Sequence, residues 1–352
     1  MIDFRYHLIS IVAVFLALAT GLVLGASLLN TQLIETQNDQ NESLIDDKNA
    51  LRDEVGALEA QQQSLEAFIT AAGPLAVRDQ LLEQRVVVVT LPGAAEGAGQ
   101  DMIDSITVDL LSAGAVEVVG TVEITEMWTD QGETDVLDGL VAQLTQEDIA
   151  LPDGTAYDRA AVLLASALVG PRRGGGGPTD PDLPPATTTT NPTTTPPEED
   201  PTEPQSGLSD NQVNTILEGL LAGGFIAYDG APTAGANLAV IVSPPAPDVE
   251  DERTEAVNTA WIRVATALDD IGTAGVLTGP ASAAEAGGVI TALRADGAAS
   301  EAVSTVDSAE VSPGQFATVL ALAAEANGST GHYGQVGDVD GPLPASLGPE
   351  AG

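Results

Sequence analysis

The feature that most constrains this chain is an uncharged apolar run near its beginning, Leu8–Leu29. As an α-helix it would be roughly 33 Å long, which matches the roughly 30 Å hydrocarbon core of a bilayer. Polar side chains in it, such as Ser10 and Thr20, can return hydrogen bonds to helix carbonyls. The run therefore predicts one transmembrane helix. The alternatives are a cleaved signal peptide and a buried helix of a soluble protein.

The charges that flank this run predict its orientation. Arg5 and the terminal amine precede it, and the next basic residue after it is Lys48. By the positive-inside rule, the short N-terminus lies in the cytoplasm. We therefore expect a single-pass protein of a cell-envelope membrane whose C-terminal part is extracytoplasmic.

Small residues recur every four positions along the same run, at Ala13, Ala17, Gly21 and Gly25. This spacing places them on one face of a helix, where two backbones can approach closely in lipid. The pattern predicts that Gly21 and Gly25 take part in homo-oligomerisation.

A polar helical stretch over 31–73 follows, with leucines at strict seven-residue spacing. This pattern predicts a coiled-coil stalk whose second core row is mostly polar, and Gly73–Pro74 is expected to end the helix. The alternative is a single helix whose leucine row packs on its own domain. The leucines expected to mediate oligomerisation are Leu44, Leu51, Leu58 and Leu65.

Beyond the stalk the pattern is that of an α/β fold. The continuous apolar run Val86–Leu91 is typical of a strand buried on both faces. A glycine-containing loop, a helix over 101–112 and a strand over 116–122 follow it, and this order predicts a parallel pair. Further helices are expected over 133–144, 157–168, 210–222, 253–271, 283–295 and 313–326, and further strands over 225–228, 238–242, 275–278 and 303–306.

The segment 171–207 is rich in Gly, Thr and Pro and poor in apolar residues, which predicts a disordered linker. We expect it to be inserted into one Rossmann-like domain with a mostly parallel sheet; two subdomains are the alternative. The predicted parts are a membrane anchor (1–30), the stalk (31–73), the α/β domain (74–170 and 208–334), the linker (171–207) and a flexible tail (335–352).

Composition excludes several kinds of function. The formal charge of −41 argues against nucleic acid as a partner, because phosphate binding needs Lys and Arg patches. The chain has no Cys, three Met and two His, so thiolate chemistry is absent and soft Cu(I) ligands are scarce. The glycines at 93, 97 and 99 do not form a dinucleotide-binding motif. We therefore predict no catalytic residue, no cofactor-binding residue and no enzymatic activity.

One short motif stands out near the C-terminus, Gly331-His332-Tyr333-Gly334. Its two glycines allow an unusual backbone path around an imidazole and a phenol. One interpretation is a closing turn whose His and Tyr cap the sheet edge. The other is a ligand contact, for which His332 is the candidate metal-binding residue.

The first residues, MIDFRYHLISIVAVFLALATGLVLG, and the GHYG at 331–334 resemble the actinobacterial copper transporter family typified by mycobacterial copper transport protein B. The order of anchor, coiled coil, α/β domain and terminal motif is similar too. The resemblance covers most of the chain except the linker. It implies an envelope protein of copper efflux and homeostasis, described in the family as a channel-forming outer-membrane protein, with copper as a transported or sensed ion.

Two other functions are compatible with the residues. The first is a non-enzymatic oligomeric scaffold of the envelope, whose α/β domain binds other envelope proteins. The second is a degenerate enzyme-like domain that still binds a small ligand.

Overall fold

The computed structural model describes residues 4–145, 149–171, 207–230, 232, 235–247, 249 and 252–344, with side chains from 6 to 25 and from 44 onward. Most of the predicted linker, the end of the predicted tail (345–352) and the side chains of 26–43 lie outside the described residues. The chain divides into two compact units, Met1–Ala67 and Phe68–Gly352.

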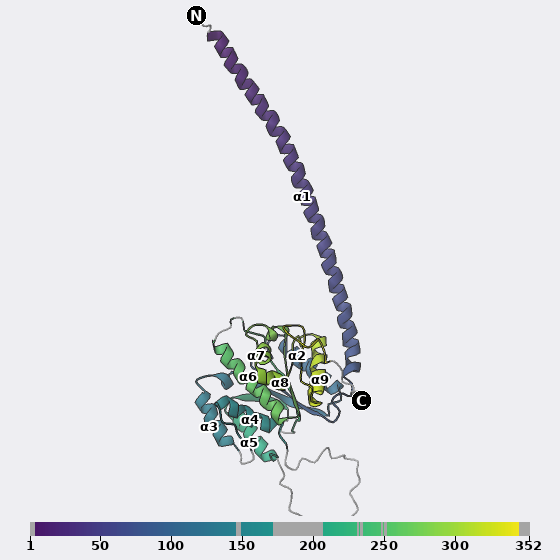
Figure 1. The fold of residues 1–352 in the computed structure, drawn as a ribbon, viewed down its shortest axis with the longest axis vertical. Helices are drawn as coiled ribbons and strands as arrows, with labels where there is room; N and C mark the ends of the chain where they lie inside the picture. The colour runs from purple at the N-terminus through teal and green to yellow at the C-terminus, as the bar shows by residue number, and fades with distance from the viewer. Residues whose placement is uncertain are drawn as a thin grey trace, which may run out of the picture. The chain divides into compact units, whose positions relative to one another are not determined.

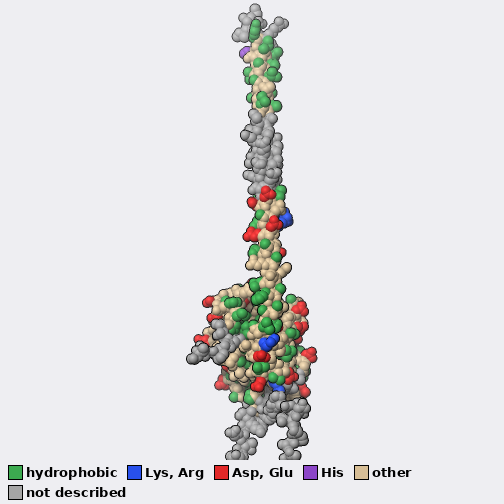
Figure 2. Space-filling view, turned by 90° about the vertical axis from the view of Figure 1, so that its right-hand side faces the viewer, with side chains coloured by type: hydrophobic (Ala, Val, Ile, Leu, Met, Phe, Trp, Pro, Cys, Tyr) green, Lys and Arg blue, Asp and Glu red, His purple; other side chains and the backbone are tan. Residues whose placement is uncertain are grey.

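Helix α1 covers Phe4–Val77. In the first unit its segment Tyr6–Gly25 is long and apolar enough to cross a membrane. The side chains of this segment are exposed, and Figure 2 shows hydrophobic groups along the face in view. The hydroxyl of Thr20 donates to the carbonyl of Leu16 at 2.8 Å, as expected for a polar group in an apolar helix.

The prediction that Gly73–Pro74 ends this helix is wrong, because α1 continues to Val77. Val77 and Leu81 are fully buried in the core of the second unit, and this burial outweighs the backbone hydrogen bond that Pro74 cannot make. A Cβ at Gly73 would lie 2.0 Å from the ring of Phe316, so glycine here allows the ring to pack against the helix backbone.

The second unit is built on one seven-stranded sheet with the order β3-β2-β1-β4-β5-β6-β7. Neighbouring strands are parallel except β3, which is antiparallel to β2. The predicted α/β class with a mostly parallel sheet is confirmed. The strands are β1 (Arg85–Thr90), β2 (Glu117–Ile124), β3 (Ile226–Gly230), β4 (Leu238–Val242), β5 (Ala274–Thr278), β6 (Ser304–Val306) and β7 (His332–Tyr333).

Both sides of the inserted segment 172–206 contribute strands to this sheet. The backbone N–H of Leu208 donates to the carbonyl of Pro171 at 3.0 Å, so the described residues on the two sides of this segment lie next to each other.

Helices cover both faces of the sheet (Figure 1). Two hydrophobic cores result, and the run of valines in β1 serves both. Val87 and Val89 belong to one core, while Val86 and Val88 belong to the other. The helices α2 (Gly99–Ser112) and α9 (Ser312–Ala326) form the second of these cores with the sheet; α3 (Thr134–Leu144), α4 (Ala156–Leu168), α5 (Asp210–Ala222), α6 (Glu252–Ile271), α7 (Val289–Ala295) and α8 (Gly297–Ala302) belong to the first.

The single helix predicted over 283–295 is divided into two. A 3-10 turn, η3 (Ala281–Ala284), precedes α7, and the chain between them bends at Gly287, which has a φ of +79°. A Cβ at Gly288 would lie 2.1 Å from the carbonyl oxygen of Ala283, which explains the glycine at this close approach. A second 3-10 turn, η1 (Glu126–Thr129), follows β2.

Candidate functional site

The GHYG motif lies at the edge of the sheet. His332 and Tyr333 form β7, which pairs in parallel with Thr305 and Val306 of β6. Residues 335–341, placed in the tail by the sequence prediction, turn back along β7. The N–H of Gly334 donates to the carbonyl of Gly341 at 3.0 Å. The motif is therefore integrated into the fold on both of its sides.

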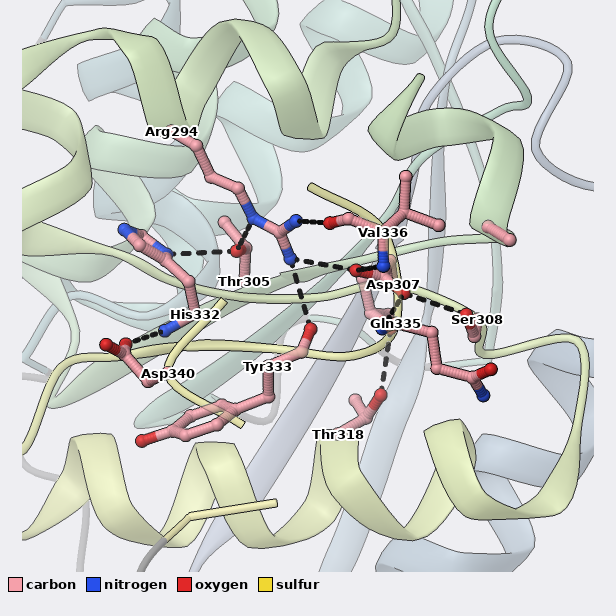
Figure 3. A network of polar contacts seen from close by, with 12 residues as sticks. Arg294, Thr305, Asp307, Ser308, Thr318, His332, Tyr333, Gln335, Val336 and Asp340 are labelled. Carbon is pink, nitrogen blue, oxygen red and sulfur yellow. Dashed lines mark hydrogen bonds and ion pairs between the residues drawn. The ribbon is translucent and has the colours of Figure 1, made fainter. Parts of the chain in front are cut away.

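A largely buried arginine holds this edge in place (Figure 3). Arg294 of α7 donates to the Thr305 hydroxyl at 2.8 Å, to the Val336 carbonyl at 2.8 Å and to the Tyr333 carbonyl at 3.1 Å. It also forms an ion pair with Asp307 at 3.1 Å. Burial lowers the pKa of Arg294, and the neighbouring Asp307 opposes that shift. One guanidinium thus joins α7, β6, β7 and the segment after the motif.

Asp307, which directly follows β6, is the anionic centre of this network and is fully buried. One carboxylate oxygen accepts from the Ser308 hydroxyl and from the N–H of Gln335, both at 2.7 Å, and the other accepts from Arg294. A Cβ at Gly334 would lie 2.2 Å from the carboxylate carbon, and Gly334 has a φ of +134°. The last glycine of the motif is therefore required by the approach of the backbone to Asp307.

The start of the motif depends on a second buried carboxylate. Glu325, at the end of α9, accepts from the Ser304 hydroxyl and from Thr330. The Ser304 oxygen in turn accepts from the N–H of Gly331 at 2.9 Å. Burial raises the pKa of Glu325, and the hydrogen bonds from Ser304 and Thr330 oppose that rise. A Cβ at Gly331 would lie 2.3 Å from the hydroxyl of Tyr333, which accounts for the first glycine.

His332 is half-buried between β6 and the returning chain. Its Nδ1 lies 3.0 Å from the Thr305 hydroxyl, and its backbone N–H donates to Asp340 at 2.8 Å. Because Arg294 already donates to the Thr305 oxygen, the hydroxyl proton can point to Nδ1 of a neutral imidazole. Burial, followed by the charge of Arg294, lowers the pKa of His332 and favours that neutral form.

Within the described residues, no group of three or more His, Asp or Glu side chains could hold a metal ion. His332 as a metal ligand stays a prediction.

The residues predicted to mediate oligomerisation lie on α1 of the first unit. The spaces beside Gly21 and Gly25 are open, with nothing within 4 Å of an added Cβ. The leucine row is solvent-exposed in the single chain. The exposed fractions are 65% for Leu44, 61% for Leu51, 58% for Leu58 and 58% for Leu65.

A cleft of about 480 Å³ opens at the carboxyl ends of β1 and β4. Pro92 follows β1 and Pro244 follows β4, and both line it, together with Arg253 and Trp261 of α6 and Glu126 of η1. Sequence reasoning missed this cleft and the Arg294–Asp307 pair. The available signal was the placement of polar and loop residues directly after predicted parallel strands, where sites in such sheets occur.

In the glycine loop after β1 (93–99), two backbone N–H groups donate to carbonyls of the same loop. The N–H of Glu96 donates to Gly93 at 3.2 Å, and that of Gly99 donates to Glu96 at 2.9 Å. A Cβ at Gly99 would lie 1.9 Å from the Ala94 carbonyl oxygen, so the loop folds tightly on itself. The loop is therefore a tight turn from β1 into α2.

Comparison with known proteins identifies the family. The model of the family described as "Copper transport outer membrane protein, MctB" matches residues 1–344. Proteins called copper transporter MctB from Mycobacterium tuberculosis and Mycobacterium bovis are 28% identical over 344 residues, covering 95% of this chain and 96% of theirs. The protein of the same name from Mycobacterium leprae is also 28% identical, over 96% of both chains. The predicted family resemblance is confirmed, and this chain belongs to the MctB copper transport protein family.

Proposed function

We propose that this protein acts in copper transport and homeostasis at the cell envelope, in the direction of efflux, and that it is not an enzyme. The observation that supports the role most directly is the family match over nearly the whole chain, since the family and its mycobacterial relatives are named for copper transport. The apolar segment Tyr6–Gly25 supports attachment to a membrane.

The test is a strain that lacks the gene, grown across a copper series. We expect growth to fail at lower copper concentrations than in the parent and intracellular copper to rise, with both effects reversed by the wild-type gene. A parallel zinc series is the control for general envelope damage. Unchanged copper content in the deletion strain would refute the efflux proposal.

The proposed topology is a single pass with the N-terminus in the cytoplasm and the α/β domain outside it. It rests on Arg5 and the terminal amine before the apolar segment and on the long interval without basic residues after it. Cysteine labelling tests it in a chain that has no native cysteine. A cysteine placed at exposed Val136 should react with a membrane-impermeant maleimide in intact cells; labelling only after lysis would contradict the orientation.

We also propose that the stalk forms homo-oligomers. Four exposed leucines on one helical face support this, because a helix with such a row gains stability by burying it against a partner. The anchor would hold stalks in one membrane and so raise their effective concentration. Burial of this leucine row would also stabilise the stalk segment of α1.

Paired substitutions test this assembly. In the fragment 31–352, which lacks Gly21 and Gly25 of the anchor, Leu51→Asp with Leu58→Asp should abolish oligomers in light scattering, because both changes place charge in the seam. The matched control is Val136→Asp with Leu221→Asp, which changes two exposed residues of α3 and α5. An unchanged mass in the first variant would contradict an intermolecular seam.

A second function is favoured by the same exposed row, namely a non-enzymatic scaffold that assembles other envelope proteins. The phenotype of the deletion strain distinguishes the two proposed functions. A scaffold without a copper role would leave intracellular copper unchanged while altering the protein composition of the envelope.

A further inference from the structure

The cleft at the carboxyl ends of β1 and β4 occupies a special place in the topology. The chain leaves β1 toward α2, which packs in one core, and leaves β4 toward α6, which packs in the other. Neighbouring parallel strands whose connections diverge in this way leave a crevice where α/β proteins bind ligands. At about 480 Å³, the cleft is in the size range of small-molecule sites.

Arg253, near the start of α6, brings a positive charge to this cleft. Three other arginines of the same unit, Arg159, Arg263 and Arg294, form ion pairs with aspartates. Within the described part of the chain, Arg253 has no carboxylate partner, although the protein carries 52 acidic residues. A guanidinium without a carboxylate partner among the described residues can bind a ligand carboxylate through two parallel hydrogen bonds.

Glu126 of η1 supplies the opposite charge in the same cleft. It forms no ion pair with Arg253. The cleft therefore presents a cation and an anion that are separately available. A molecule with one negative and one positive group would satisfy both.

Part of the cleft wall is apolar, and part of it is fixed in shape. Val257 and Trp261 lie on α6, and Val289 begins α7. The side chain of Asn258 donates to the carbonyl of Gly287 at 2.9 Å, which ties α6 to the turn before α7. Such a tie lowers the ordering cost when a ligand enters. These walls suit an aliphatic side chain.

Two observations narrow the ligand class. The N–H groups of Glu96 and Gly99 donate to carbonyls within the glycine loop, so these two amides are not available to a phosphate. A net charge of −41 repels anions from the protein as a whole, which disfavours a ligand with a net negative charge. We propose that this cleft binds a zwitterionic amino acid with an apolar side chain. Its carboxylate contacts Arg253, its ammonium contacts Glu126, and its side chain lies against Val257 and Trp261.

Calorimetry on the full-length protein in detergent tests this site with three related probes. L-leucine carries both charges, its methyl ester lacks the carboxylate, and N-acetyl-L-leucine lacks the ammonium. We expect saturable binding of leucine and at least about tenfold weaker binding of each derivative, because each has lost one charge-assisted contact. The proposal is independent of copper, so all titrations are made in the presence of a copper chelator.

Substitutions locate the site. Arg253→Met should weaken leucine binding at least about tenfold and remove the preference for leucine over its ester. Arg263→Met is the matched control, because this residue lies on the same helix but pairs with Asp158 at 3.2 Å. Equal melting temperatures of the two variants show that both fold.

Absence of leucine binding at millimolar concentration would overturn the proposal. Binding that survives Arg253→Met, or tighter binding of the N-acetyl form than of leucine, would overturn it as well.

Discussion

Removal of Arg294 should strongly destabilise the sheet domain. The partner of this arginine, Asp307, is fully buried, and only 11% of the Arg294 side chain is exposed. In Arg294→Met the apolar part of the side chain is retained, but the carboxylate of Asp307 stays buried without its counter-charge. Breaking a buried pair in this way costs about 3–5 kcal/mol of unfolding free energy. The carbonyls of Tyr333 and Val336 also lose a donor.

The matched control is Arg159→Met. Arg159 pairs with Asp138, and 28% and 48% of the two side chains are exposed. Solvent screens such a pair, so its loss should cost about 0–1 kcal/mol. The two substitutions are chemically identical, and the sites differ in burial and in the additional hydrogen bonds that Arg294 donates. A difference of about 3 kcal/mol corresponds to more than a hundredfold change in the unfolding equilibrium.

Urea unfolding of the full-length protein in detergent, followed by tryptophan fluorescence, measures this difference. Both tryptophans of the chain, Trp128 and Trp261, are buried in the second unit, so the signal reports on the sheet domain. We expect a lower midpoint for Arg294→Met with an unchanged slope. If Arg294→Met and Arg159→Met shift the midpoint equally, the buried network does not stabilise this edge as argued.

Two further predictions concern the same unit and the same urea assay. Gly334→Ala should lower the free energy of unfolding by about 2–4 kcal/mol, because the new Cβ would meet the Asp307 carboxylate and the residue would hold a strained φ. The control is Gly139→Ala, which lies in open space on α3 and should be neutral or stabilising. Equal effects of the two substitutions would contradict this reasoning. Burial raises the pKa of Asp269 from 3.8 to about 7, so the folded state holds this proton more tightly than the unfolded state and the unfolding free energy falls as pH rises from about 4 to about 7. Asp269→Asn should keep the hydrogen bond from Gly275 and, after solvent screening, reduce the fall in unfolding free energy by about 1–2 kcal/mol. If the variant loses as much unfolding free energy between pH 4 and pH 8 as the wild type, Asp269 is not the titrating group.

Local signals in the sequence predict much of the fold. The valines of β1 alternate between two buried cores, and their continuous apolar run is what a strand covered on both faces requires. The start of α5 is signalled by Ser209 and Gln212, which form a capping box. These features depend on neighbours along the chain, so they can be identified from the residues alone.

The elements that sequence reasoning missed depend on distant partners. β7 has only two residues, and its edge is held in place by Arg294 and Asp307, which lie well before it in the chain. The continuation of α1 past Pro74 follows from the burial of Val77. The cleft combines residues that follow β1, β2, β4 and β5, and it becomes visible only when the strand order is known.

The hydrogen bond between Leu208 and Pro171 has a consequence for how this family can vary in length. Because the two ends of the inserted segment already meet, its length hardly affects the folded domain. Doubling the length of a segment between two fixed ends costs only about 0.6 kcal/mol in closure entropy. Relatives can therefore lose or extend this segment with little effect on stability, and it is a suitable place for a reporter tag.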